Sequence, residues 1–269
     1  MEDKYLNSSK KMQMESKTAS LFPRIHSNNT MKDIEAYELN SKRVFCSYFN
    51  DEIEHFFAQK TSLEVGCGGR CSGINLLSKF GLDAIYAIDL SSANVLSTQV
   101  LCNQLGIANA VVEQGNALAI QHESGKFDFV MSDGVIHHTL DTKKAFLEIT
   151  RVLKPGGVIF LGIYGYGGLL GLVFPLGKYL GKFIPYRFML WLVNKTGFLR
   201  SQEYSILDWL YTPIQRNYRA STIESWLEQS RYTNIVRVKS NKWFFNMGIL
   251  SSLLFGKGYL YFFAKKGSI

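Results

Sequence analysis

The sequence predicts an α/β domain, in which helices cover both faces of a mostly parallel sheet. Between residues 62 and 163, short apolar runs typical of buried strands alternate with segments in which apolar residues recur every three or four positions. A composition of 46% apolar and 14% aromatic residues supplies a large core and excludes a fibrous or mainly disordered chain. The length of 269 residues leaves open one decorated domain or two domains.

The predicted elements follow one another in a regular order. Helical spacing over 33–57 predicts one or two leading helices. Strands are then expected at 62–65, 84–88, 110–114, 127–132 and 158–163, with helices at 73–80, 91–105 and 142–153. After a Gly-rich, aromatic and basic segment at 164–200, the pattern predicts a helix near 221–229 and strands at 234–238 and 259–265, the two strands being separated by an apolar segment at 243–255. Ligands of such sheets bind beyond the carboxyl ends of the strands, so the residues that follow these ends are expected to face one crevice.

Charge is unevenly distributed along the chain. Residues 1–150 carry 14 basic and 18 acidic side chains, whereas residues 151–269 carry 16 basic and 4 acidic ones, a net charge of +12. The basic part suggests an anionic substrate, membrane headgroups or nucleic acid as its partner. Four cysteines are too few for a disulfide scaffold, and we expect reduced thiols. Residues 1–29 are polar and lack the apolar segment of a secretory signal, so a flexible, frayed leader and a cytoplasmic protein are expected.

An acid and a Gly-x-Gly turn follow the first predicted strand. The stretch 63–69 has the sequence LEVGCGG, and Asp89 follows the second strand 25 residues beyond Glu64. Glycine allows a sharp turn and a close approach of ligand to backbone. A dinucleotide fingerprint would place a third glycine at Cys71, and Asp89 is well placed to accept both hydroxyls of a ribose. A nucleoside ligand without a pyrophosphate fits this pattern best.

Two more stretches make the pattern specific: SDGVIHH at 132–138 and RVLKPGG at 151–157. Together with the glycine loop and Asp89, they make the chain similar to the class I S-adenosylmethionine-dependent methyltransferases, in particular the broad small-molecule "methyltransferase domain" group. The resemblance covers about 61–164 and, more loosely, 218–265. It implies a single Rossmann-like, doubly wound, seven-stranded sheet, mostly parallel with an antiparallel last strand. It also implies S-adenosylmethionine as the cofactor and S-adenosylhomocysteine as the product.

The resemblance assigns cofactor contacts position by position. Glu64, Gly66, Cys67 and Gly68 would lie against the methionyl part, Asp89 would hold the ribose, and Leu90 would pack beside the adenine. Asn116, followed by Ala117, stands where an acid often meets the adenine amine, and its carbonyl can accept the same hydrogen bond. The loop after the fourth strand, Ser132, Asp133 and Gly134, would complete the cofactor site. Arg70 and Arg231 depart from the family pattern, which has glycines at these two positions.

His137 and His138 follow the fourth strand and are the candidate catalytic residues. An imidazole there could remove a proton from the acceptor, and we expect only one of the two to face the ligand. The alternative is a histidine at a helix start that contacts the cofactor or a backbone carbonyl. Methyl transfer is an in-line displacement in which positioning supplies much of the rate, so many such enzymes need no strong base.

Candidate substrate residues lie after the fifth strand. Tyr164 and Tyr166 could line an acceptor pocket or simply pack. Tyr211, Arg216 and Tyr218 belong to a polar and aromatic cluster, with Asp208 and Arg219, that could bind a carboxylate or phosphate or form a solvated basic face. We expect no metal site.

The segment after the fifth strand, up to Trp191, is apolar and then basic. The 14 charge-free residues from 164 to 177 would span about 21 Å as a helix, which is short of the roughly 30 Å hydrocarbon core, so a transmembrane helix is not expected. Three alternatives remain: a movable lid over a largely apolar acceptor pocket, a packed helix, or a helix lying on a membrane surface. The expected division is a leader at 1–29, a helical cap at 30–60, a cofactor core at 61–163, a lid at 164–220 and a sheet completion at 221–269.

The predicted function is methyl transfer to an oxygen or nitrogen of a small-molecule acceptor, which the apolar segment suggests is hydrophobic. One alternative is a nucleic-acid methyltransferase, favoured by the basic C-terminal part. The sequence SDGV after the fourth strand lacks the Pro-Pro-aromatic pattern of enzymes that flip and methylate base amines. Another is a noncatalytic cofactor-binding protein or partner subunit of the same fold. Oligomeric state is not predicted.

Overall fold

The computed structural model describes residues 7–25, 31–166, 179, 181, 183–195, 207–208, 210–238 and 258–268. The described helices are α1 (Ser8–Ile25), α2 (Met31–Phe49), α3 (Ile53–Phe57), α4 (Ser72–Ser78), α5 (Ser92–Gln104), α6 (Thr142–Val152), α8 (Tyr186–Lys195) and α10 (Ala220–Gln229), with single 3-10 turns η2 (Asn50–Glu52) and η3 (Ile136–His138). The described strands are β1 (Thr61–Val65), β2 (Ala84–Asp89), β3 (Ala110–Gln114), β4 (Phe127–Asp133), β5 (Leu153–Tyr164), β6 (Tyr232–Val238) and β7 (Tyr259–Lys266).

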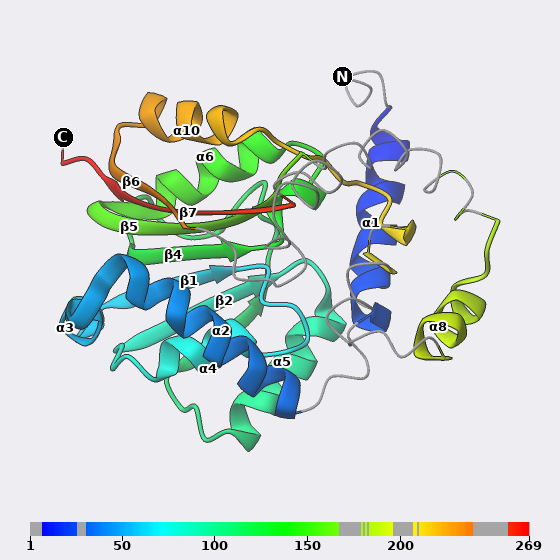
Figure 1. The fold of residues 1–269 in the computed structure, drawn as a ribbon, viewed down its shortest axis with the longest axis horizontal. Coiled ribbons are helices and arrows are strands. Elements are labelled where there is room, and N and C mark those ends of the chain that lie inside the picture. The colour runs from blue at the N-terminus through cyan, green and yellow to red at the C-terminus, as the bar shows by residue number, and fades with distance from the viewer. Residues whose placement is uncertain are drawn as a thin grey trace, which may run out of the picture.

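The described strands form one sheet of seven in the order β3-β2-β1-β4-β5-β7-β6 (Figure 1). Neighbouring strands from β3 to β5 pair in parallel, whereas β7 pairs antiparallel with both β5 and β6. The prediction of a doubly wound, mostly parallel sheet with an antiparallel last strand is therefore confirmed.

The start of β5 differs from the prediction. The strand was expected at 158–163, but residues 154–157, whose Pro-Gly-Gly is typical of a turn, are part of it, and it begins at Leu153. Leu153 pairs with Phe127, and the register of the β4–β5 ladder then shifts before Phe129 pairs with Val158. The extra residues are thus accommodated as an irregularity of a long strand, which local turn signals cannot distinguish from a true turn.

Helices cover both faces of the sheet, and each face has its own core (Figure 1). On one face, Phe45 of α2 is fully buried, and its ring centroid lies 5.7 Å from that of Phe129, 5.2 Å from that of Phe160 and 5.2 Å from that of Phe263. On the other face, α6 and α10 contribute buried residues such as Phe146 and Ile223. Two closely packed apolar layers hold the sheet rigid, so the loops at its carboxyl edge are attached to a rigid support.

Helix α1 was not predicted. Part of the expected frayed leader is helical, so that expectation was wrong over Ser8–Ile25. Asn7 caps the helix, because its Oδ1 accepts from the backbone N of Lys10 at 2.9 Å. Figure 1 shows α1 standing beyond the carboxyl ends of the parallel strands, where the ring of Phe22 lies 5.4 Å from that of His138. The helix is polar and touches the core at few positions, so apolar periodicity gave no signal for it.

The predicted lid is described only in part. Most of its apolar run, from 167 to 177, and the apolar segment at 243–255 lie outside the described residues. Within the described part, α8 follows Pro185 and places Phe188 and Trp191 on the surface. None of the helices described is both long and apolar enough to cross a bilayer.

Candidate active site

The glycine loop after β1 is tied to the end of β2. The backbone N of Gly66 donates to Ile88 O at 2.7 Å, and that of Cys67 donates to the same oxygen at 3.2 Å. Gly66 has φ +80°, and a Cβ there would lie 2.4 Å from the side chain of Val135. Only glycine therefore fits, and the loops after β1 and β4 pack directly on each other.

Asp89 is held in one orientation by the protein itself. Its Oδ2 accepts from Gly68 N at 2.9 Å, and its Oδ1 accepts from Ser91 N at 2.9 Å and from Asn94 Nδ2 at 3.1 Å. Burial raises the pKa of Asp89, and these three hydrogen bonds oppose the rise. A carboxylate has about four acceptor positions, so a ribose that uses both oxygens would take the last free position and replace one of the present donors.

Glu64 is buried at the end of β1 and faces the start of α4. A Cβ on Gly73 would lie 2.1 Å from Glu64 Oε1, so the missing side chain of Gly73 makes room for the carboxyl group. Glu64 Oε2 has no hydrogen-bond partner among the described residues. Burial, followed by the charge of Asp133, raises the pKa of Glu64 from 4.5 to about 8, while Arg70 opposes the rise. A buried, unsatisfied carboxyl group of this kind suits a cationic ligand group.

Asp133 is engaged by two tyrosines that the sequence analysis did not find. Tyr37 of α2 donates its hydroxyl to Oδ2 at 2.8 Å, and Tyr259 of β7 donates to Oδ1 at 2.7 Å. These partners lie 96 and 126 positions away in the chain, so no local motif reveals them. Next to Asp133, Ser132 is fully buried and Gly134 N donates to Gly162 O at 2.9 Å. The loop that was predicted to contact the cofactor is thus held in place by hydrogen bonds with α2, β7 and β5.

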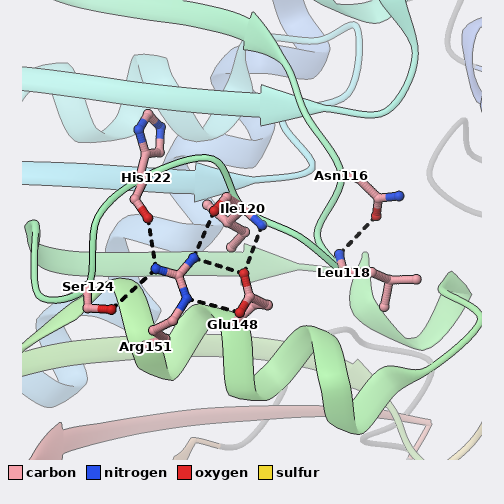
Figure 2. Close-up of polar contacts among 7 residues, drawn as sticks. All are labelled: Asn116, Leu118, Ile120, His122, Ser124, Glu148 and Arg151. Carbon is pink, nitrogen blue, oxygen red and sulfur yellow. Dashed lines mark hydrogen bonds and ion pairs between the residues drawn. The ribbon is translucent and has the colours of Figure 1, made fainter.

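The expected adenine end of the site is braced by α6, as Figure 2 shows. Arg151 donates to the carbonyl of Ile120 at 2.7 Å and to that of His122 at 2.8 Å, and it pairs with Glu148 at 2.9 Å. Asn116 Oδ1 accepts from Leu118 N at 2.9 Å in a local turn. One acceptor position of this oxygen is therefore occupied, and its second lone pair is the one left for an adenine amine.

Positions beside these complete the cofactor set. Leu90 is half-buried after β2, and its carbonyl accepts from Gln114 Nε2 at 3.0 Å. Ala117 is buried after Asn116. Both lie next to the braced groups, at the carboxyl edge to which the resemblance assigned the cofactor.

The two histidines of η3 have different surroundings. His138 Nδ1 lies 2.8 Å from the carbonyl oxygen of Ile214, which can only accept, so this nitrogen carries a proton. Its Nε2 lies 3.4 Å from Asp208 Oδ2. Burial alone would raise the pKa of Asp208, but the charge of His138 and hydrogen bonds from His138, Thr212 and Tyr164 lower it. Asp208 is therefore an ionised partner that holds His138 in place.

His137 is the histidine that is free to accept a proton. It is fully buried, and neither ring nitrogen has a hydrogen-bond partner in the described part of the chain. Burial lowers the pKa of His137 well below its ordinary value, the charge of His138 lowers it further, and Asp208 opposes the change. Its ring centroid lies 4.1 Å from that of His138 and 4.0 Å from that of Tyr164. The imidazole is thus neutral and fixed by packing at the carboxyl end of β4.

The predicted substrate residues do not form a single cluster. Tyr164 donates its hydroxyl to Asp208 and lies beside His137. Arg216 donates to the carbonyls of Thr139 and Leu140, so its guanidinium binds the loop after η3.

The other three predicted substrate residues make contacts elsewhere. Tyr211 donates to Ile184 O at 2.9 Å. Tyr218 bonds through its backbone N to Tyr164 O at 2.9 Å, and its ring contacts Trp226. Tyr166 is 62% exposed, with Arg219 above its ring. The side chain of Tyr164 thus lies against the histidine pair. Across the described residues, no group of three or more His, Cys, Asp or Glu could hold a metal ion.

The fold and this site define a class of protein. A sheet of this order, with an acid-Gly-x-Gly loop after β1 and an acid after β2, is the arrangement that the resemblance to the class I S-adenosylmethionine-dependent methyltransferases implies. Residues 63–161 match the family model described as "Methyltransferase domain". The resemblance inferred from the motifs is confirmed.

Three proteins illustrate the similarity. The chain is 32% identical over 108 residues to phosphoethanolamine N-methyltransferase 2 of Caenorhabditis elegans. The matched region is 40% of this chain and 24% of that protein. It is 31% identical over 105 residues to a ubiquinone biosynthesis O-methyltransferase of Methylococcus capsulatus, with 38% and 43% covered. The chain thus spans less than half the length of these curated relatives. The solved phosphoethanolamine N-methyltransferase 2 of Haemonchus contortus, in complex with S-adenosyl-L-methionine, has the same fold, with a TM-score of 0.56, 18% identity, and 92% of this chain and 60% of that chain covered.

Proposed function

We propose that the protein is an S-adenosylmethionine-dependent methyltransferase that moves a methyl group to an oxygen or nitrogen of a small-molecule acceptor. The observation that carries the proposal is the bond between Gly68 N and Asp89, which joins the glycine loop and the β2 acid within the methyltransferase domain. The relatives named above include an N-methyltransferase and an O-methyltransferase. Both atom types therefore stay open for the acceptor.

The residues present fit the proposed cofactor. Glu64 offers a buried carboxyl group without a described partner, which suits the cationic methionyl part. Asp89 offers acceptor capacity to the ribose, and Asn116 offers a lone pair to the adenine amine. When bound, the cofactor supplies a methyl group attached to a sulfonium sulfur, and this methyl group is transferred by in-line displacement.

The chain's own residues supply positioning and proton removal in the proposed reaction. His137 would accept the proton that the acceptor atom loses, because its imidazole is neutral and both ring nitrogens lack a described partner. Asp208 and the carbonyl of Ile214 hold His138 as a hydrogen-bond donor. The ring of His138 is therefore fixed in place and packs beside His137. Tyr164, on the other side of the His137 ring, would border the acceptor.

The function is tested with the full chain and labelled S-adenosylmethionine. The protein is incubated with an extract of its own cells, and mass spectrometry identifies what gains the label. A small molecule among the labelled products supports the proposal, and labelled RNA or DNA alone contradicts it. Calorimetry with S-adenosylhomocysteine and a nicotinamide dinucleotide tests the cofactor separately, since tighter binding of the dinucleotide would overturn the methyltransferase assignment.

Affinity for S-adenosylhomocysteine is expected to rise with pH up to about 8, by at most tenfold per pH unit, with release of a proton. In the free protein, burial raises the pKa of Glu64 to about 8, so the carboxyl group is protonated at neutral pH. A ligand ammonium group beside it favours the ionised form and expels the proton. Calorimetry in two buffers of different ionisation enthalpy measures the proton released.

Glu64→Gln is the matched control, because the amide has nearly the same shape and no proton to release. Proton release that persists in this variant would assign the released proton to another group.

The raised pKa of Glu64 also affects the stability of the fold. Above pH 4.5 the unfolded chain loses a proton that the folded state keeps. This group therefore makes folding less favourable as the pH rises from 4.5 to about 8.

We further propose that the protein is cytoplasmic and touches a membrane through α8 to reach a hydrophobic acceptor. Phe188 and Trp191 of α8 are 53% and 54% exposed, and Arg187 and Lys195 are exposed on the same helix. Aromatic and cationic side chains on one surface helix favour contact with anionic lipid headgroups. The helix stands outside α1 at the carboxyl end of the sheet (Figure 1).

The membrane proposal predicts co-sedimentation with phosphatidylglycerol-containing vesicles and not with pure phosphatidylcholine vesicles. Trp191→Ala is expected to lose most of this binding, because it removes a large exposed aromatic side chain. Leu96→Ala is the matched control, since Leu96 is 63% exposed on α5, on the main body of the domain. Equal sedimentation with both kinds of vesicle would remove the proposal.

A further inference from the structure

Two buried cysteines face each other beneath the glycine loop. The Sγ atoms of Cys71 and Cys102 lie 3.2 Å apart and share a hydrogen bond, although the residues are 31 positions apart in sequence. Cys71 immediately precedes α4 and has φ +55°, and Cys102 lies in the last turns of α5. Both are free thiols in the structure, and their side chains are almost completely shielded from solvent.

This geometry is close to that of a covalent bridge. A disulfide places its sulfurs about 2.05 Å apart, so the two atoms must approach each other by about 1.2 Å. Side-chain rotation and a small displacement of one chain segment can supply that movement. Cys71 belongs to the short segment between the loop and α4, whereas Cys102 lies within a helix of 13 residues.

We propose that Cys71 and Cys102 are an oxidation site that forms a reversible intramolecular disulfide when the protein meets a hydroperoxide. The Cys102 thiolate attacks one peroxide oxygen, the O–O bond breaks, and Cys102 becomes a sulfenic acid. The Cys71 sulfur then attacks the Cys102 sulfur, the S–O bond breaks, and water leaves. In sum, two thiols and one hydrogen peroxide give one disulfide and two waters, and the two thiols supply the two electrons.

The contacts of the pair favour Cys102 as the attacking sulfur. The hydrogen bond from Cys71 lowers the pKa of Cys102, and burial opposes this effect. The same hydrogen bond raises the pKa of Cys71, which keeps its proton and acts as the resolving thiol. Cys46, on α2, is partly exposed and lies outside the pair, so it serves as the comparison thiol.

The bridge would act on the proposed cofactor site, and this step rests on the proposed function. Helix α5 already holds the loop through two bonds: Thr98 Oγ1 donates to Gly68 O, and Ser97 Oγ donates to Gly69 O. A third, covalent link at Cys71 would pull the far end of the same loop toward α5. Because Gly68 N is bonded to Asp89, that displacement reaches the expected ribose contact. We expect weaker cofactor binding, of order tenfold, the scale of a typical coupling between two sites.

The test oxidises the full chain with hydrogen peroxide and maps its peptides without reduction. A peptide pair joined through Cys71 and Cys102, which dithiothreitol separates, is the expected result. Cys102→Ala should abolish it, and Cys46→Ala should leave it intact. Sulfinic or sulfonic acid at Cys102 without the cross-linked pair, or cross-linking through Cys46 alone, would overturn the proposal. Because the mapping uses the wild-type chain, a Cys102→Ala variant that fails to fold does not remove the test.

Calorimetry with S-adenosylhomocysteine then measures the coupling in the reduced, oxidised and re-reduced protein. Weaker binding in the oxidised form, restored by dithiothreitol, supports the coupling, and equal binding in all three overturns it. Absence of binding in the reduced protein would contradict the proposed function, while the cross-linking result would still decide whether the disulfide forms.

Discussion

Replacing His137 with Gln is expected to lower turnover about 100-fold or more while affinity for S-adenosylhomocysteine changes little. The imidazole is neutral, fully buried and without a described hydrogen-bond partner, so it is the group able to take the acceptor's proton. Steady-state kinetics with the acceptor that the labelling experiment identifies, and calorimetry with S-adenosylhomocysteine, measure the two quantities separately.

The pH profile distinguishes a base from a packing residue. Because burial lowers the pKa of His137, the wild-type kcat at saturating cofactor should stay level through neutral pH and fall only under acidic conditions, where the imidazole becomes protonated. The variant should lose this acid limb. His138→Gln is the matched control: it breaks the contacts with Asp208 and Ile214 and is expected to lower the melting temperature while keeping the acid limb. Normal turnover and an unchanged profile in both variants would show that neither histidine is a base.

Asp89→Ala is expected to weaken binding of S-adenosylhomocysteine by about 1.5 to 3 kcal/mol, roughly 10- to 150-fold, through loss of a charge-assisted hydrogen bond. The same change leaves Gly68 N, Ser91 N and Asn94 Nδ2 without their common acceptor, so the loop also loses its anchor. Calorimetry measures the affinity.

Asp83→Ala is a suitable control for that measurement. Asp83 is exposed and lies just before β2, at the opposite end of the strand from Asp89. A loss of affinity in Asp89→Ala that is no larger than in the control would remove Asp89 from the ribose role.

Most of the sheet could be predicted because its signals are local. The apolar runs of β1 to β4 and the acid-Gly-x-Gly loop lie within short windows, and the family resemblance supplied the strand order. The braces of the site could not be predicted in this way. Tyr37 and Tyr259 reach Asp133 from α2 and β7, and Asp208 reaches His138 across the segment after β5. Such contacts form only when distant elements pack together, and no spacing along the chain records them.

The sequence also could not predict which histidine of the pair is the candidate base. His137 and His138 are adjacent in sequence, and their residue types give no ground for choosing between them. Their different roles follow from what surrounds each ring: a carbonyl and a carboxylate for His138, and packed rings for His137. The tertiary environment, which the sequence alone does not display, separates the candidate base from its neighbour.

The placement of α2 sets the smallest piece of this chain that can be expected to fold. Residues 63–161 carry the match to the methyltransferase domain, yet Phe45 stands at the centre of one core layer and Tyr37 holds Asp133 from outside that range. An excised 63–161 fragment would expose the rings of Phe129 and Phe160 to water and would have no partner for the strand edge that β7 covers. Such a fragment should aggregate. Truncations of the chain are therefore better begun before Met31 than at the border of the sequence match.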